Sequence, residues 1–374
     1  LEPYALHLSK TLNDQFLQGA QEFLANMDNN NKDDFEKETQ LSQLLSTLAS
    51  MVVSMNSQKD TTASMVNTFE PSVTFVLDNA MLSFLTDVMG LLETSNFVLK
   101  TMTPQTWKIY DTVLDSFENY GFEYFDNYGP YFQTVVNYGF QGQSIDSDQR
   151  VQKLLKALLN FYNDSNGDDE MLQMVYNLSM LIILNCDNVE SIMELLLKPI
   201  FKSLSNISID VLRDYLRIFL ALFIRRPDLI SQLTDNDITE LTQFVSLWFE
   251  NAEMLLTTVF DLKLEILALI SILEAQIPQL DSMKESMLKN LLQLIEKLPA
   301  AIDKRVKLIK MENEGGSDSS LLVDDDPNSF DIDDDEYAEL DVDTPLDNVN
   351  VLDQFKDFVA KNQLQLSAIM SGKQ

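Results

Sequence analysis

Apolar residues recur with the spacing of one helix face almost throughout this chain of 374 residues. Neighbouring apolar positions lie three or four residues apart, as one face of an α-helix requires. Three such stripes consist of Val151, Leu154, Leu155, Leu158, Leu159 and Tyr162; of Met287, Leu288, Leu291, Leu294, Ile295 and Leu298; and of Trp107, Tyr110, Val113, Leu114 and Phe117. Glycine, which sheets need at hairpins and bulges, accounts for only 10 residues. The pattern predicts an all-α fold.

Short polar segments separate these stripes. Asn, Asp and Ser, which favour caps and turns, dominate residues 28–34, 137–148, 163–169, 203–208 and 234–237. Two helices per interval give a repeat close to the ~40–47 residues of HEAT and armadillo units. Residues 171–184 and 217–223 are apolar almost all round, which suits the inner layer of a solenoid, although a bundle could bury them too. We therefore predict an α-solenoid of HEAT-type helical hairpins over residues 1–311.

One helix start is well marked in the sequence. Thr103 has the side chain of an N-cap, and Pro104 suits the first helical position. Met102, just before the cap, can pack against Trp107 as a hydrophobic staple. These residues predict that a helix begins at residue 104.

The negative charge is concentrated in one segment. The net charge is −33, and residues 312–347 contain 15 Asp or Glu and no Lys or Arg. High like charge with few apolar residues predicts a disordered acidic loop over residues 312–348. Residues 349–374 resume an amphipathic pattern, and a helix this short must dock on the solenoid or fray.

The charge favours basic proteins as partners and disfavours nucleic acid and anionic membranes. The rest of the chain carries −18 as well, so solubility alone is the alternative explanation. The candidate contacts for a basic partner are Asp324, Asp325, Asp326, Asp331, Asp333, Asp334, Asp335 and Glu336. Steering by such charges raises the association rate more than the affinity, and salt weakens it.

No catalytic constellation is present in the sequence. His7 is the only histidine and Cys186 the only cysteine, so no zinc site can be built from several such ligands. No phosphate-binding glycine loop occurs either. The longest uncharged helical run, residues 171–186, is shorter than a membrane span. We expect a non-enzymatic protein that needs no cofactor or metal and does not enter a membrane.

The aspartate runs 324–326 and 331–335 superficially suggest a magnesium-dependent prenyl-diphosphate enzyme. Such a site also needs basic residues around the diphosphate. No Lys or Arg occurs between Lys310 and Lys356, and Pro327 interrupts the first run. The enzyme interpretation is therefore disfavoured.

Residues 120–140 are crowded with aromatic side chains. Most are expected to form inter-helix core, and a minority could line shallow grooves for Phe-rich peptides. At the start of this segment and just before it, Met102-Thr-Pro-Gln-Thr-Trp107, Phe117 and Tyr120-Gly-Phe-Glu-Tyr-Phe125 resemble the importin seven/eight branch of the importin-β superfamily. Tyr120 stands where that branch has the first Asp of an Asp-Gly-Phe-Asp-Tyr-Phe turn.

Further segments match the same family in the same order along the chain. They are Leu220-Ala-Leu-Phe-Ile-Arg-Arg-Pro227, Phe244-Val-Ser-Leu-Trp-Phe249, Lys263 with Leu267–Leu269, and Thr344-Pro-Leu-Asp-Asn348 with Phe355. The acidic insertion is shorter than expected of the animal members, so the chain resembles the C-terminal part of a fungal relative.

The resemblance implies a HEAT-repeat receptor that carries cargo through nuclear pores and shuttles between cytoplasm and nucleus. Its partners would be basic cargo such as ribosomal proteins or histones, Phe-Gly nucleoporins, and Ran-GTP through the full-length protein. The family's principal Ran site lies in N-terminal repeats, which we expect to lie outside this segment. The alternative function is a HEAT-repeat scaffold of a complex unrelated to nuclear transport.

Overall fold

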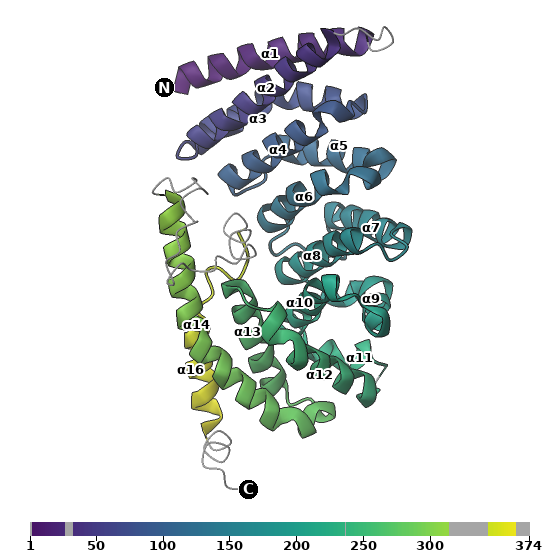
Figure 1. Cartoon of the computed structure of the whole chain (residues 1–374), viewed down its shortest axis with the longest axis vertical. Helices are drawn as coiled ribbons and strands as arrows, with labels where there is room; N and C mark the ends of the chain where they lie inside the picture. Colours follow the sequence, from purple (N-terminus) through teal and green to yellow (C-terminus); the bar gives the residue numbers. More distant parts are fainter. Residues whose placement is uncertain (1, 27–32, 236, 314–342, 364–374) are drawn as a thin grey trace, which may run out of the picture. The chain divides into compact units, whose positions relative to one another are not determined.

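A computed structural model describes residues 2–26, 33–235, 237–313 and 343–363 (Figure 1). Over these ranges the chain forms α-helices joined by turns and short 3₁₀ or π segments, and no strand occurs in them. The helices pack against one another as in an all-α solenoid of helical repeats, which confirms the predicted fold class. The described residues form two compact units, residues 1–178 and 179–374.

In the first unit the helices pack in two layers. The elements are α1 (Glu2–Asn26), α2 (Asp33–Ser54), α3 (Lys59–Asp78), α4 (Leu85–Leu99), α5 (Pro104–Tyr120), α6 (Phe125–Gly139), α7 (Gln149–Asp164) and the first part of α8 (Asp169–Asn185). Helices α1, α3 and α5 contact one another in sequence, and α2, α4 and α6 do the same. Figure 1 shows these helix pairs stacked one on the next. This alternation is that of stacked helical hairpins.

The start of α5 is built as predicted. Thr103 accepts a hydrogen bond from the Thr106 backbone nitrogen at 3.2 Å, its own backbone nitrogen donates to the Thr106 hydroxyl, and Pro104 occupies the first turn. Gly139, at the end of α6, explains how Met102 and Trp107 fit together. A Cβ at Gly139 would lie 2.6 Å from the Trp107 ring and 2.7 Å from Met102, so glycine permits their close approach.

The prediction that most of the aromatic segment forms core is confirmed in part, because four of its nine aromatic side chains are fully buried and the other five are half-buried. Tyr128, Tyr131, Phe132 and Phe140 are buried. Trp107 stacks on Phe140 with ring centroids 5.9 Å apart. Aromatic pairs at such distances add to the stabilisation from burial. The segment therefore ties α5 to α6, and a groove for Phe-rich peptides remains a prediction.

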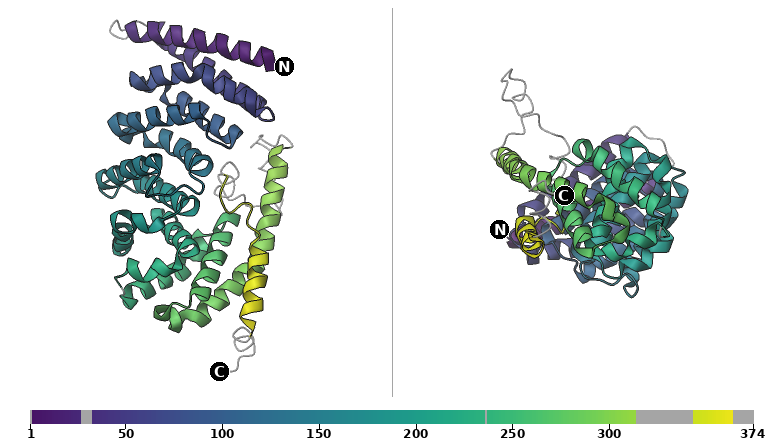
Figure 2. Two further views of the ribbon diagram at one scale, coloured as in Figure 1. Left: turned by 180° about the vertical axis from the view of Figure 1, so that it is seen from behind. Right: turned by 90° about the horizontal axis from the view of Figure 1, so that it is seen from below.

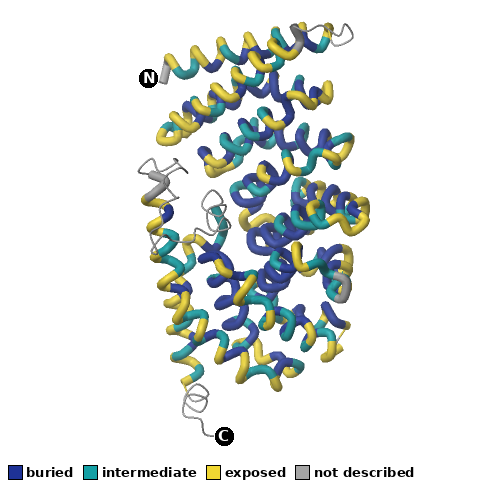
Figure 3. The backbone as a smooth tube through the Cα atoms, viewed as in Figure 1, coloured by how far each residue is buried: buried dark blue, intermediate teal, exposed yellow. Residues whose placement is uncertain are grey.

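The second unit is organised around two buried helices. Its elements are the rest of α8, α9 (Lys198–Lys202), α10 (Ile209–Arg225), α11 (Ile230–Leu233), α12 (Ile238–Leu255), α13 (Val259–Ala275), α14 (Lys284–Asn313) and α16 (Val351–Lys361). Helix α10 packs against α13, and α13 packs against α14 and α16. Both α10 and α13 are buried along most of their length (Figure 3).

Helix α16 packs along α13 (Figure 2, yellow). Val351 and Phe358 are buried, and the Lys361 ammonium lies 2.9 Å from the Glu274 carboxylate on α13. Most of the predicted acidic loop, residues 314–342, and the end of the chain, residues 364–374, lie outside the described residues.

Candidate functional site

The predicted contacts for a basic partner all lie outside the described residues. These are Asp324, Asp325, Asp326, Asp331, Asp333, Asp334, Asp335 and Glu336. The structure does describe the chain on both sides of this acidic segment. Helix α14 leads into it as far as Asn313, and a turn at residues 344–347 follows it. The attachment of that turn to the helices therefore defines the candidate site.

The turn after the acidic segment is bound by one lysine of α13. Lys263 Nζ donates hydrogen bonds to the backbone oxygens of Leu346 at 2.8 Å and Asp347 at 3.0 Å. The Thr344 backbone nitrogen donates to Asp347 Oδ2 at 2.6 Å, which closes the turn, and the Leu346 side chain is buried. Arg305 of α14 lies 3.8 Å from the Asp347 carboxylate. We call Lys263, Arg305 and the turn 344–347 the loop anchor.

Burial determines the electrostatics of the loop anchor. Desolvation lowers the pKa of Lys263 from its usual value, and Arg305 acts in the same direction, while Asp347 opposes them. The ammonium is held in this place by hydrogen bonds to carbonyl oxygens. Its charge makes these bonds stronger than hydrogen bonds between neutral groups. The loop anchor joins Lys263 to the segment 344–348, and both of these resemble the importin family in sequence.

Replacing Lys263 with methionine is expected to loosen the turn and α16. Methionine keeps much of the apolar stem but leaves the backbone oxygens of Leu346 and Asp347 without the donor that Lys263 provides. Hydrogen bonds to a charged group contribute about 1.5–3 kcal/mol each. Amide hydrogen exchange over residues 344–361 should therefore accelerate by about tenfold or more.

Lys356→Met is the matched control for this variant. Lys356 lies on α16, and within the described residues its ion pair is with exposed Asp353, at 2.7 Å. Exposed pairs contribute ~0–1 kcal/mol, so exchange should change little. Unchanged exchange in Lys263→Met would show that the turn is held by other contacts.

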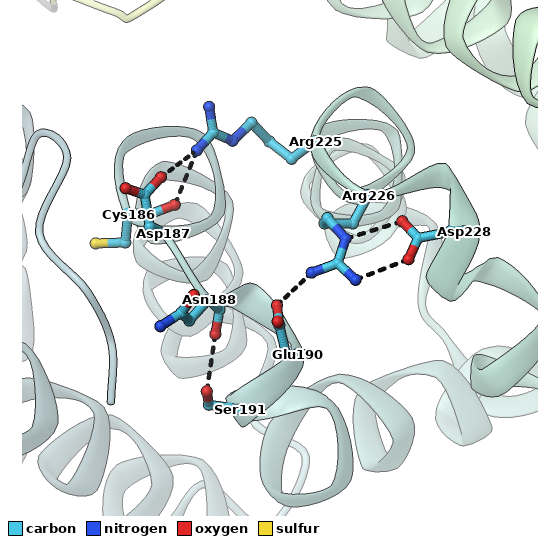
Figure 4. Close-up of polar contacts among 8 residues, drawn as sticks. All are labelled: Cys186, Asp187, Asn188, Glu190, Ser191, Arg225, Arg226 and Asp228. Carbon is cyan, nitrogen blue, oxygen red and sulfur yellow. Dashed lines mark hydrogen bonds and ion pairs between the residues drawn. The ribbon is translucent and has the colours of Figure 1, made fainter. Parts of the chain in front are cut away.

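The two arginines of the Arg225-Arg226-Pro227 segment, which resembles the importin family, form hydrogen bonds and ion pairs within the chain (Figure 4). Arg225 donates to the Cys186 backbone oxygen at 3.1 Å and to Asp187 at 3.0 Å. Arg226 binds both carboxylate oxygens of Asp228, at 2.8 and 2.7 Å, and also Glu190.

These contacts connect the turn after α8 with the turn after α10. The guanidinium of Arg226 lowers the pKa of Asp228 from its usual value, and its carboxylate partners raise the pKa of Arg226. A bidentate pair of this kind fixes geometry as well as charge. The segment therefore has a structural role between hairpins of the second unit.

A groove of about 730 Å³ lies among α12, α13 and α14. Apolar side chains form much of its wall, among them Phe249, Leu256, Leu262 and Leu294. Its volume falls in the range of ~300–1,000 Å³ that is typical of small-ligand pockets. The sequence gives no signal for this groove, because its wall comes from three helices.

Glu265 is the unusual residue of the groove wall. Its side chain is only 2% exposed, and its Oε2 accepts a hydrogen bond from Trp248 Nε1 at 2.6 Å. Its Oε1 is buried with no hydrogen-bond partner among the described residues. Burial raises the pKa of Glu265 to about 8, while the Trp248 hydrogen bond lowers it, Asp261 raises it and Lys297 lowers it. At neutral pH the carboxyl is therefore mostly protonated.

This pKa makes the stability of the chain depend on pH. The folded carboxyl keeps its proton to about pH 8, whereas the unfolded chain releases it near 4.5. Between these values the folded state binds one more proton, so the free energy of unfolding falls by about 1.4 kcal/mol per pH unit as pH rises. The contribution is fully present below 4.5 and is lost as pH passes 8.

Glu265→Gln removes the titrating group but can still accept from Trp248. As the pH rises from about 6 to 7.5, the wild type should lose about 2 kcal/mol of unfolding free energy that the variant keeps. Urea titrations at several pH values measure it. Glu296→Gln, at an exposed position on the groove wall, is the control. A constant difference across this range would place the pKa of Glu265 near its ordinary value.

The histidine and the cysteine considered in the sequence belong to neither the loop anchor nor the groove. His7 is exposed on α1, and Cys186 is buried and forms no disulfide. In the described ranges no group of three or more His, Cys, Asp or Glu could hold a metal ion. None of the described helices is both long and apolar enough to cross a membrane.

Comparison with known proteins finds one distant relative. No family model matches the chain, and no solved structure matches it. The chain is similar to Nonsense-mediated mRNA decay protein 5 of Saccharomyces cerevisiae, with 24% identity over 206 residues. The match covers 50% of this chain and 19% of the yeast protein. The chain is thus similar to a small part of a much longer protein.

Proposed function

We propose that this chain is the C-terminal part of a nuclear transport receptor of the importin-β superfamily, in its seven/eight branch, and that it binds basic protein cargo. The loop anchor is the observation that carries the proposal. Lys263 binds the turn 344–347, and both belong to segments on which the family resemblance rests. An all-α fold of helical repeats fits such a receptor. So does similarity to part of a longer yeast protein.

In this proposal the acidic segment attracts the cargo. Residues 312–347 contain 15 acidic side chains and no basic one. The end of α14 and the loop anchor attach the segment to the second unit. A tethered anionic chain raises the local concentration of a basic partner and screens its charge. Ribosomal proteins and histones are cargo of suitable charge.

The remaining partners belong to the whole receptor. We expect Phe-Gly nucleoporins to bind during passage through the pore, and Ran-GTP to act through the full-length protein. The receptor would shuttle between cytoplasm and nucleus. Its work is binding and release, for which it needs no catalytic residue, metal or cofactor.

Deleting residues 315–341 tests the role of the acidic segment and leaves the loop anchor intact. Association with a basic ribosomal protein should slow by about tenfold or more at low salt, because electrostatic steering is lost. High salt should abolish the difference between the two chains. Stopped-flow fluorescence with labelled cargo measures both rates.

A chain of unchanged length, with Asn and Gln in place of the Asp and Glu of 315–341, is the control for loop length. It should associate as slowly as the deletion. Equal rates for all three chains at low salt would remove the acidic segment from the mechanism. Absence of any binding to basic proteins would contradict the proposed function itself.

A further inference from the structure

The groove among α12, α13 and α14 contains a buried carboxyl oxygen for which the described chain provides no hydrogen-bond partner. Glu265 Oε1 is buried and has no hydrogen-bond partner among the described residues, while its Oε2 is bound by Trp248. Buried polar atoms of this kind are rare, and each costs about 1–3 kcal/mol unless something binds it. Because Glu265 lies in the groove wall, a ligand in the groove can supply the missing partner.

The charges around the groove favour a cation as that partner. Three carboxyl groups line it, those of Glu253, Glu265 and Glu296, against one ammonium, that of Lys297. Lys297 lies 2.9 Å from Glu253 and is therefore already paired. Below the wall, Asp261 is bound by Arg217 of α10 at 2.7 Å, so this second buried carboxylate is also compensated. Among the described residues no ion pair compensates the other two carboxyl groups of the groove, Glu296, which is exposed, and Glu265, which is buried.

The apolar wall restricts the kind of cation. A small hydrated ion would leave the partly exposed side chains of Phe249 and Leu294 uncovered. A lysine or arginine side chain has an apolar stem that covers such surface and a charged end that donates hydrogen bonds. The wall and the acceptor together match a basic residue flanked by apolar ones.

We propose that this groove binds a basic segment of a partner protein, inserting one lysine or arginine side chain whose charged end pairs with Glu265. The inference rests on the proposed function, because it gives the basic cargo a defined contact on the helical body in addition to the acidic segment.

Binding changes the protonation of Glu265. The neutral carboxyl gives up its proton, the carboxylate pairs with the ammonium or guanidinium, and the proton passes to the buffer. With the pKa of Glu265 raised to about 8, close to one proton should be released per peptide at neutral pH. Trp248, hydrogen-bonded to the same carboxyl, should report the change in its fluorescence.

The test titrates the whole chain with the peptide acetyl-Leu-Lys-Leu-amide, using calorimetry in two buffers of different ionisation enthalpy. The expected result is release of about one proton on binding. The analogue with norleucine in place of lysine should bind at least tenfold more weakly and release no proton. Glu265→Gln should weaken binding of the lysine peptide at least tenfold, whereas Glu296→Gln should change it less than about threefold.

Equal affinity for the lysine and norleucine peptides, or equal losses in the two variants, would overturn the site. Loss of the site is distinguishable from loss of the proposed function. If Glu265→Gln leaves peptide binding intact while the whole chain still binds a basic ribosomal protein, only the groove is wrong. A thermal melt of Glu265→Gln at about pH 6 controls for folding.

Discussion

Replacing Arg217 with methionine is expected to lower the free energy of unfolding of the second unit by about 3–5 kcal/mol. Arg217 lies on α10 and donates to both carboxylate oxygens of Asp261 on α13, at 2.7 and 2.9 Å. Asp261 is 0% exposed, so removing the guanidinium leaves a buried carboxylate without its counter-charge. Thr258 donates to the same carboxylate at 2.9 Å, but a hydroxyl cannot neutralise it.

Urea titration followed by the fluorescence of Trp248 measures the effect. The double variant Arg217→Met with Asp261→Asn is the control, since it removes both charges of this pair, although the carboxylate of Asp214, 3.5 Å from Arg217, stays in place. If the two residues interact through their charges, the loss of unfolding free energy in the double variant should be at least ~2 kcal/mol smaller than the sum of the losses in the two single variants. A loss below ~1 kcal/mol for Arg217→Met would mean that the pair contributes little to the packing of α10 on α13.

Replacing Phe117 with alanine is expected to lower the stability of the first unit by about 3–5 kcal/mol. Phe117 is 0% exposed and lies at the centre of four rings. Its centroid distances are 4.9 Å to Phe122, 5.2 Å to Tyr128, 5.3 Å to Phe132 and 5.5 Å to Phe161. The ring therefore connects α5, α6 and α7, and its removal leaves a cavity that the surrounding rings cannot easily fill.

Trp107 lies in the same unit and reports its unfolding in urea. The same substitution at Phe35 on α2, which is 77% exposed, is the control and should change stability by no more than ~0.5 kcal/mol. Similar losses at Phe117 and Phe35 would contradict the assignment of the aromatic segment to the core.

The sequence was a good guide to the helices because their periodicity is local. Helix α7 shows both the strength and the limit of that signal. Val151, Leu154 and Leu158 are buried as predicted, but Leu155 is only half-buried while Phe161, outside the predicted stripe, is fully buried. Spacing identifies an apolar face, whereas the packing of neighbouring helices decides where its centre lies.

Contacts between distant residues could not be predicted in this way. Lys263 and Leu346 are separated by 83 positions, and Arg217 and Asp261 by 44. One signal was present, however. Arg217, Asp261, Lys263 and Glu265 are ionisable residues within largely apolar helices, and a helix with apolar residues on nearly every face tends to bury the charges near its middle. Such residues deserve consideration as sites before a structure is known.

The acidic segment illustrates the opposite case. Its composition suggests a partner by charge alone, and its candidate contacts, Asp324–Asp326 and Asp331–Glu336, lie outside the described residues. The structure adds the loop anchor and the groove with Glu265, which composition could not indicate. The proposed binding of basic proteins therefore combines one electrostatic element from the sequence with one shaped site from the fold.

Retention of the intact chain on immobilised Phe-Gly repeat peptides tests most directly whether it belongs to a nuclear transport receptor. A column of Ser-Gly repeats of equal length is the control. A transport receptor should be retained on the Phe-Gly column and released by soluble Phe-Gly peptide, while passing through the Ser-Gly column. Elution from both columns at the same volume would contradict the account and favour a helical scaffold unrelated to transport.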